Sequence, residues 1–255
     1  GAGHDRQVGL ALSGVGAVGA VGEAVHALPR AVALGAVGRR PAARRHGAEV
    51  AVGTWLLDEF GPQGQDLRRL VDARVARQAA RRRLSRYGHV HLHGSLAEME
   101  HTAGIEGCVY SNEYFDALPF HRVVWKDGKL WELWVEMEGE TLCERPGPPT
   151  PGLAEAFAST GIVLEDGQEG EVCLAMEESV EEISRMLSRG FVMTVDYGGA
   201  AAELFGAHRP RGTRRTFSNH AVGDDPFVEI GQRDITAHVD FTRLARLGSA
   251  RELEP

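Results

Sequence analysis

Hydrophobic and polar residues alternate most regularly between residues 121 and 145. The runs His121 to Trp125 and Leu130 to Met137 are rich in β-branched and aromatic residues, and they flank Asp127-Gly128, the sequence of a tight two-residue turn. If the second run is an extended strand, one of its faces carries Trp131, Leu133, Val135 and Met137, and the other carries Leu130, Glu132, Trp134 and Glu136. The pattern predicts a β-hairpin near residues 121 to 145 with one wholly apolar face.

A helical period leads into an apolar run further along the chain. Val180, Ile183 and Leu187 share one face of a helix predicted from Glu177 to Ser188, which Gly190 would end. The runs from Phe191 to Val195 and from Gly107 to Ser111 read as buried strands, and the NEYFDALP segment after the latter is expected to turn into a helix. Because a parallel sheet needs helices between its strands, the sequence predicts an α/β fold.

The basic stretch from residue 66 to 86 also has a helical pattern. Its apolar residues fall near one helical face, so an amphipathic surface helix is expected; they are Leu67, Leu70, Val71, Val75 and Leu84. His89, His91 and His93 then alternate with apolar residues in a short predicted strand. No neighbouring carboxylate or cysteine pair completes a zinc ligand set with these imidazoles, so no metal site is predicted.

Residues 1 to 52 differ in composition from the rest of the chain. They contain no Phe, Tyr, Trp, Ile, Asn, Thr or Lys, and no period of a strand or helix runs through them. We expect an irregular segment there, a domain from 53 to 255, and a proline-rich loop at 146 to 152. The apolar run from 8 to 22 is short and interrupted by glycines, so no membrane span is expected.

Charge is distributed unevenly about a net value of −8. Residues 1 to 100 carry 14 basic and 9 acidic side chains, whereas residues 101 to 255 carry 14 basic and 27 acidic ones. An acidic main body disfavours nucleic-acid binding and suits a cationic partner, such as an arginine-containing segment of a protein. The cysteines, Cys108, Cys143 and Cys173, have neither disulfide nor zinc spacing and fit a reducing compartment.

Polar side chains follow two of the predicted strands. Asn112, Glu113 and Asp116 come after the GCVYS strand, and Asp196 and Tyr197 follow FVMTV. Ligands of open α/β sheets bind at the carboxyl ends of strands, so these residues are candidates for a functional site. Structural roles are the alternative: Asn112 and Asp116 could cap a following helix, Asp234 could begin another helix, and Asp240 could lie on an exposed turn.

Four motifs occur in a fixed order between residues 107 and 241. They are GCVYSNEYFDALPFHRV at 107 to 123, DYG at 196 to 198, GTRR at 212 to 215 followed by His220 and Asp225-Pro226, and IGQRDITAHVDF at 230 to 241. In this order they resemble the MidA-type family of SAM-dependent methyltransferases, the family of mitochondrial complex I assembly methyltransferases. The resemblance implies a Rossmann-like class I methyltransferase sheet with the hairpin inserted. It also implies S-adenosylmethionine as the methyl donor and an arginine of a partner protein as the acceptor.

The resemblance, together with the chemistry of methyl transfer, assigns expected roles to individual residues. A guanidinium stays protonated and carboxylates bind it bidentately, so Glu113 and Asp116, with Asn112, are expected to hold the acceptor. Further substrate contacts are expected from Asp196, Tyr197, Arg215, His220, Asp234 and His238. On the donor side, the positions of the family correspond to Gly53, Thr54, Asp72, Ser95, Leu96 and Asn112.

The donor loop departs from the glycine-rich pattern of the family. In GAEVAVGTWLLDEF, residues 47 to 60, Glu49 and Ala51 stand where glycines are expected, and their side chains would fill space that the ligand needs. We expect a domain that is incomplete at both ends. It would be either an arginine methyltransferase or a non-catalytic binding or assembly module with a degraded donor site. The cytoplasm is the expected location, or the mitochondrial matrix in a eukaryote, and a homodimer is left open.

Overall fold

The structure, a computed structural model, describes residues 105–218, 221–230 and 233–254, and four strands nearer the N-terminus at 8–13, 30–35, 66–70 and 90–93. The chain divides into two compact units. The first unit comprises residues 1–114, 179–196 and 245–255, and the second comprises residues 115–178 and 197–244. Each unit is therefore built from segments that are distant in the sequence.

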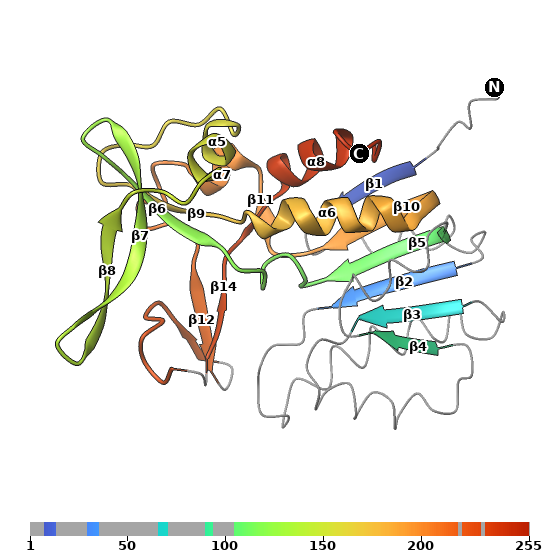
Figure 1. The fold of residues 1–255 in the computed structure, drawn as a ribbon, viewed down its shortest axis with the longest axis horizontal. Helices are drawn as coiled ribbons and strands as arrows, with labels where there is room; N and C mark the ends of the chain where they lie inside the picture. The colour runs from blue at the N-terminus through green and yellow to red at the C-terminus, as the bar shows by residue number, and fades with distance from the viewer. Residues whose placement is uncertain are drawn as a thin grey trace. The chain divides into compact units, whose positions relative to one another are not determined.

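The first unit contains a six-stranded parallel sheet (Figure 1). Its strands follow the order β1-β10-β5-β2-β3-β4, and every neighbouring pair is parallel. They are β1 (Val8–Ser13), β2 (Arg30–Gly35), β3 (Asp66–Leu70), β4 (Val90–His93), β5 (Ile105–Asn112) and β10 (Leu187–Val195). Parallel strands need helical crossovers, so the α/β class predicted from the sequence is correct.

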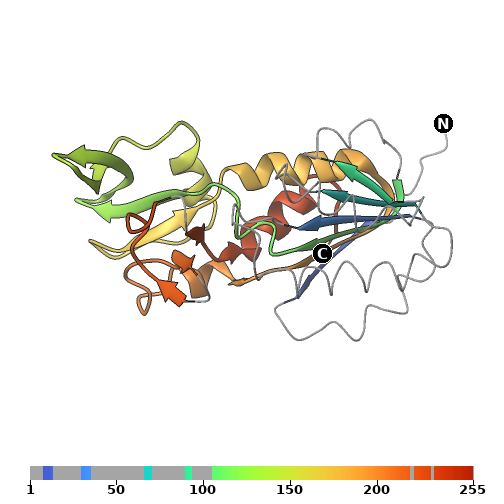
Figure 2. The same ribbon diagram turned by 90° about the horizontal axis from the view of Figure 1, so that it is seen from below.

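The helix predicted from Glu177 to Ser188 is present as α6 (Ala175–Met186). From Ser179 onward it lies along one face of the sheet (Figure 2), and its residues Val180, Ile183 and Met186 are buried. The sheet beneath this helix is equally apolar, because Val109 of β5 pairs with Val192 of β10 and both are buried. Strand β10 begins at once with Leu187, so Gly190 lies inside that strand and does not end the helix.

Residues 66 to 70 form strand β3, so the helix predicted over 66 to 86 is wrong at its start. Leu67 and Leu70 are three residues apart, which fits a helix. A segment this short, however, does not distinguish the period of a helix from that of a strand. Pairing on both sides decides the outcome, since Leu67 is registered with Ala31 of β2 and with Val90 of β4.

Strands β1 and β2 lie within residues 1 to 52, where no regular element was expected. Their sequences, VGLALS and RAVALG, are nearly unbroken apolar runs. Strands of a parallel sheet are usually covered on both faces and so carry no alternating pattern. Strands β1 and β2 therefore have no hydrophobic period by which the sequence alone would identify them.

The second unit contains a four-stranded antiparallel sheet in the order β8-β7-β6-β9. Its strands are β6 (His121–Lys126), β7 (Lys129–Glu138), β8 (Thr141–Gly147) and β9 (Glu169–Val172). The two strands predicted to flank Asp127-Gly128 are present and pair through this turn. Asp127 and Gly128 both have positive φ, at 54° and 75°, as the favoured two-residue hairpin turn demands.

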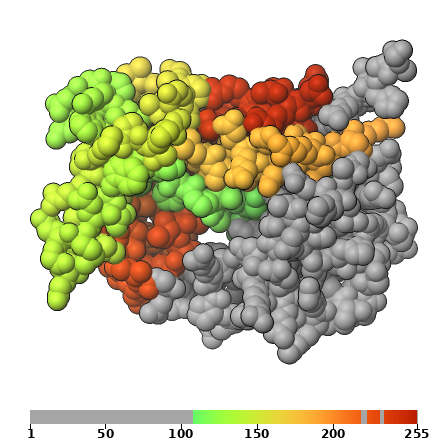
Figure 3. Space-filling view, viewed as in Figure 1, coloured from blue at the N-terminus to red at the C-terminus, as the bar shows by residue number. Residues whose placement is uncertain are grey.

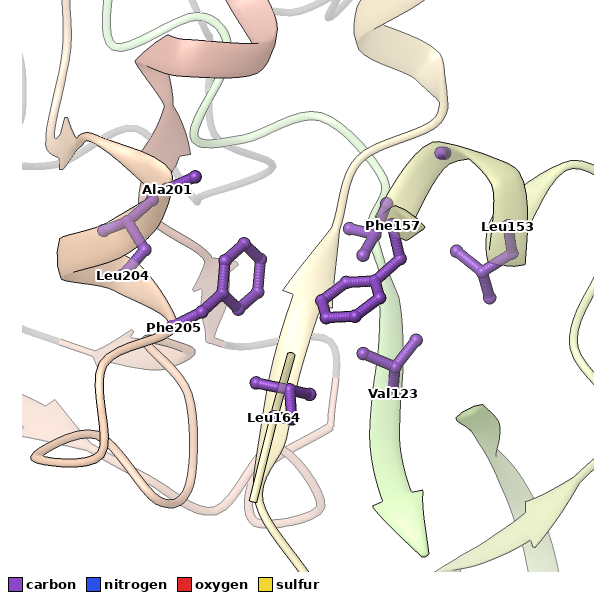
Figure 4. Packing of buried hydrophobic residues seen from close by; sticks show 9 residues of the cluster. Val123, Leu153, Phe157, Leu164, Ala201, Leu204 and Phe205 are labelled. Carbon is purple, nitrogen blue, oxygen red and sulfur yellow. The ribbon is translucent and has the colours of Figure 1, made fainter. Parts of the chain in front are cut away.

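The core of the second unit forms where this sheet meets two short helices, α5 (Leu153–Ala158) and α7 (Ala201–Leu204). Figure 4 shows Val123, Leu153, Phe157 and Leu204 of these elements converging with Leu164 and Phe205, which lie just outside them. The rings of Phe157 and Phe205 meet edge to face, with centroids 5.4 Å apart and an interplanar angle of 88°. Aromatic pairs in this geometry stabilise a core by more than the burial of their surface area alone would.

Two small sheets complete the second unit. A three-stranded sheet has the order β13-β12-β14, with β12 at Arg215–Ser218, β13 at Ala221–Gly223 and β14 at Asp234–Thr236. A two-stranded parallel sheet joins β11 (Gly198–Gly199) to β15 (Val239–Asp240), directly before helix α8 (Phe241–Ser249). Asp234 thus begins a strand, and the alternative in which it starts a helix is wrong.

Candidate functional site

The carboxyl edge of the parallel sheet brings together Asn112, Glu113 and Asp196 in the first unit. Asn112, the last residue of β5, is registered with Val195 of β10. Glu113 donates its backbone N–H to the Val195 carbonyl at 2.9 Å, and the carboxylate of Asp196 accepts the Tyr114 N–H at 3.1 Å. Asp196 is 1% exposed, and its carboxylate holds the backbone of the segment after β5. Asn112 and Glu113 remain partly accessible.

The segment after Asn112 is a turn, and the helix expected there is not formed. Glu113 has φ of 46°, a left-handed conformation, and the Leu118 N–H reaches the Phe115 carbonyl at 3.3 Å. Non-glycine residues adopt such angles at a cost, typically where the surroundings fix them. The interpretation of Asn112 and Asp116 as helix caps is therefore wrong.

A small pocket lies within the second unit and has a polar floor among apolar walls. Asp116, Asp240 and Arg243, all buried, line it with Glu171, His238 and Cys173. Apolar side chains supply the remaining wall, among them Phe115, Leu118, Phe120 and Met176. Its volume is about 20 Å³, room for roughly one or two water molecules. The pocket therefore admits the end of a side chain and excludes a group the size of adenosine.

Asp240 lies inside the pocket, and the exposed turn considered for it is wrong. Its carboxylate accepts the Arg243 N–H at 3.0 Å, across the start of helix α8. The guanidinium of Arg243 lies 3.6 Å from the Glu177 carboxylate. Asp116 is connected differently, because its carbonyl accepts the Ala237 N–H at 3.1 Å. The DALP and DITAHVDF motifs are thus joined through backbone at the pocket.

His238 and Cys173 are held uncharged near neutral pH by their surroundings. Burial lowers the pKa of His238, and the positive charges of Arg209 and Arg215 lower it further. Burial raises the pKa of Cys173 to about 11, so this thiol is not a ready nucleophile.

Glu171, which no sequence motif marks, anchors the GTRR segment. Its carboxylate accepts hydrogen bonds from the Thr213 N–H at 2.6 Å and the Thr213 hydroxyl at 3.0 Å. The same hydroxyl oxygen accepts the His238 N–H at 3.1 Å, and Arg122 lies 3.4 Å from Glu171 on the other side. Glu171 therefore fixes the backbone that presents His238 to the pocket.

Gly212 fits this anchor only because it has no side chain. It has φ of 73°, and a Cβ there would lie 2.4 Å from the Glu171 carboxylate. We expect Gly212→Ala to lower the free energy of unfolding by about 2 kcal/mol, through left-handed strain and contact with a buried carboxylate. Gly161 is the control, because its φ is 72° but nothing lies within 4 Å of the added carbon.

Urea unfolding followed by tryptophan fluorescence measures both variants. Gly161→Ala reports the cost of the backbone angle alone, which we expect to be about 1 kcal/mol. Equal losses in the two variants would contradict the close contact with Glu171.

The other predicted residues are dispersed. Tyr197 is 52% exposed, and its carbonyl accepts the Val239 N–H at 2.8 Å. Arg215 and Asp234 lie on β12 and β14 of the three-stranded sheet, and the guanidinium of Arg215 is 3.5 Å from Asp224. Neither residue lines the pocket. Gly53, Thr54, Asp72, Ser95, Leu96 and His220 lie outside the described residues.

Two further findings concern only the part of the chain that the structure describes. Within it, no three His, Cys, Asp or Glu side chains gather closely enough to hold a metal ion. No helix in the same part has the length and apolar character needed to cross a membrane.

The chain belongs to a family of methyltransferases. The family described as "Putative S-adenosyl-L-methionine-dependent methyltransferase" matches residues 65–255, well over half of the sequence. This match confirms the resemblance seen in the four motifs, and S-adenosylmethionine is the cofactor of the family.

Similar proteins agree with this assignment. The Protein arginine methyltransferase NDUFAF7 homolog, mitochondrial, of Drosophila melanogaster is 29% identical over 155 residues, which cover 56% of this chain and 32% of that protein. The chain thus spans about a third of the length of that relative. The native crystal structure of an uncharacterized protein from Burkholderia thailandensis superimposes with a TM-score of 0.72 at 25% identity, covering 90% of this chain and 59% of that one.

A second structure from Burkholderia thailandensis has S-adenosyl-homocysteine bound. It has a TM-score of 0.72 at 24% identity, over 90% of this chain and 57% of that one, so the likeness concerns the fold.

The described strand ends fit such a cofactor at the carboxyl edge of the parallel sheet. Strand β2 ends at Gly35, which is registered with Asn112 at the end of β5. A glycine at that place leaves the backbone open to close approach by a nucleoside. Gly35 was not predicted, and its signal in the sequence is a glycine that closes the apolar run RAVALG.

Proposed function

We propose that the chain is a protein methyltransferase that transfers a methyl group from S-adenosylmethionine to an arginine side chain of a partner protein. One observation carries the acceptor assignment: buried carboxylates, Asp116 and Asp240, line a pocket that admits only the end of a side chain. A carboxylate buried among apolar groups is costly unless a cation or hydrogen-bond donors satisfy it. An arginine end supplies both charge and donors.

The proposed role of Asp116 is to orient the guanidinium. Carboxylate and guanidinium match as a fork of two parallel hydrogen bonds, which fixes the plane of the cation and the direction of its nitrogens. Alignment of the accepting nitrogen is the main requirement of an in-line displacement. Asp116 is proposed for this role because it lies in the DALP motif, is buried and lines the pocket.

On the donor side we propose Asn112, at the end of β5, together with Gly35, and Glu113 keeps the acceptor role that the resemblance implies. S-adenosylmethionine, when bound, supplies an electrophilic methyl group on its sulfonium. Gly53, Thr54, Asp72, Ser95 and Leu96 are proposed as further donor contacts on the strength of the family resemblance. Asp72 follows the end of β3 by two residues, which suits an acidic residue that binds ribose hydroxyls.

The arrangement of the whole domain is proposed on the same basis. The parallel sheet, with its order β4-β3-β2-β5-β10-β1, corresponds to a Rossmann-like class I methyltransferase sheet into which the antiparallel hairpin sheet is inserted. The proposed domain would include strands β1 and β2, which lie before residue 53, together with residues 53 to 255. The mitochondrial matrix is the proposed compartment in a eukaryote, because the Drosophila relative is named as mitochondrial.

Titration calorimetry with S-adenosylmethionine tests the proposal at the donor loop, where the sequence departs from the glycine-rich pattern of the family. We expect binding by the wild-type chain and loss of binding in Gly53→Val, with circular dichroism showing that both remain folded. A folded wild-type chain that gives no binding heat would overturn the enzymatic assignment and favour the non-catalytic module.

A further inference from the structure

The β7–β8 hairpin extends beyond the sheet to which it belongs. Strand β6 pairs with β7 only as far as Glu132, whereas β7 and β8 continue to pair up to Glu138 and Thr141. We call the segment from Leu133 to Pro146 the ribbon, and Figure 3 shows it in yellow-green at the surface. In the described part of the chain β8 is an edge strand, so its outer side is open to pairing.

The ribbon exposes large apolar side chains. Val135 is 56% exposed and Met137 is 62% exposed, and both belong to the wholly apolar face of β7 that the sequence pattern predicts. Trp134, on the opposite face, is 43% exposed. Neighbouring apolar side chains exposed on one short element are unusual on a soluble surface and commonly mark an interaction site.

Acidic side chains accompany these apolar residues. Glu136, Glu138 and Glu140 are exposed on the ribbon. The exposed cation among them, Arg145, lies 2.7 Å from Glu138 and 3.9 Å from Glu136. Glu144 instead turns inward to Arg122 and Arg214. The accessible part of the ribbon is thus apolar and net negative.

The negative charge of the ribbon favours a basic partner over a second copy of the ribbon. Two copies of the ribbon placed edge to edge would bring the glutamates of both chains together, and like charges on paired strands are destabilising. A basic segment gains from the same glutamates, and an extended peptide can add itself to an exposed strand edge while its alternate side chains contact one face.

We propose that the ribbon docks an extended segment of the protein substrate in which basic and apolar residues alternate. This inference rests on the proposed function, because the segment would belong to the protein that carries the acceptor arginine. The ribbon binds it through main-chain pairing along β8, apolar contact with the face on which Leu142 of β8 lies beside Met137 and Val135 of β7, and attraction by Glu136 and Glu138 on the other face.

Fluorescence anisotropy with a labelled twelve-residue peptide of alternating arginine and valine tests this proposal. The full chain is expected to bind it, and binding is expected to weaken about tenfold in V135S/M137S and in E136K/E138K. The matched controls are Val163→Ser, at a site 78% exposed, and E155K/E165K, which changes the net charge equally at exposed positions away from the ribbon. Both controls are expected to bind as the wild type does.

Several results would overturn the proposal. Equal weakening in E155K/E165K would indicate attraction to net charge alone, and equal binding of a peptide with glutamate in place of arginine would remove the charge argument. A wild-type dimer in sedimentation that V135S/M137S converts to a monomer would identify a second copy as the occupant. Peptide binding is measured without S-adenosylmethionine, so ribbon-dependent binding without methyl transfer would count against the proposed function and leave docking in place.

Discussion

Asp116→Asn is expected to lower kcat/KM for methyl transfer to an arginine peptide by about 10²- to 10³-fold, the usual effect of removing one preorganised polar contact from a catalytic site. The amide keeps the size of the carboxylate but loses its charge. It also turns an N–H₂ donor toward a guanidinium that has only donors to offer. Steady-state assays with labelled S-adenosylmethionine measure the effect.

Glu165→Gln is the control, since this exposed glutamate lies outside the pocket and loses its charge in the same way. Its kcat/KM is expected to stay within about twofold of the wild type, as is usual for surface substitutions away from a site. Thermal unfolding of both variants separates a lost contact from a lost fold. Full activity in a folded Asp116→Asn variant would remove Asp116 from the acceptor site.

Gly198→Ala is expected to lower the free energy of unfolding by about 3 kcal/mol, the upper range for overpacking a site that cannot yield. Gly198 pairs with Val239, and a Cβ there would lie 2.2 Å from the Val239 carbonyl oxygen. The obstacle is backbone, so the strand pair β11–β15 must separate. Because Asp240 belongs to β15 and lines the pocket, the pocket is expected to lose its shape as well.

The neighbouring glycine provides the control. A Cβ at Gly199 would meet the end of the Glu203 side chain at 2.7 Å, and that exposed, flexible group can move away. Gly199→Ala is therefore expected to cost less than about 1 kcal/mol. Chemical unfolding of both variants is the measurement, and a Gly198→Ala chain as stable as Gly199→Ala would contradict the close strand pairing.

Elements specified by local signals could be predicted from the sequence. The hairpin at Asp127-Gly128 needs only two residues that accept positive φ between two runs of alternating apolar and polar residues. Helix α6 needs only apolar residues at helical spacing. Residues 66 to 70 carry no comparable local signal. Their strand exists because β2 and β4 lie on either side of it, and a short window does not contain that information.

The candidate site was predictable only where a motif marked it. Asp116 and His238 lie in recognisable motifs and both line the pocket. Glu171 has no such mark, because its partners Thr213 and Arg122 are 42 and 49 residues away in the sequence. Asp240 looked exposed for a similar reason, since the pairing of β15 with β11 that buries it joins distant segments.

Identification of the methylated residue tests the central claim most directly. The chain would be incubated with S-adenosylmethionine labelled in its methyl group and a peptide containing arginine and lysine, and the peptide would then be hydrolysed to amino acids. We predict label in methylarginine, and none in this fraction when Asp116→Asn replaces the wild type. Label in methyllysine alone, or no transfer by a folded chain that binds S-adenosylmethionine, would contradict the account.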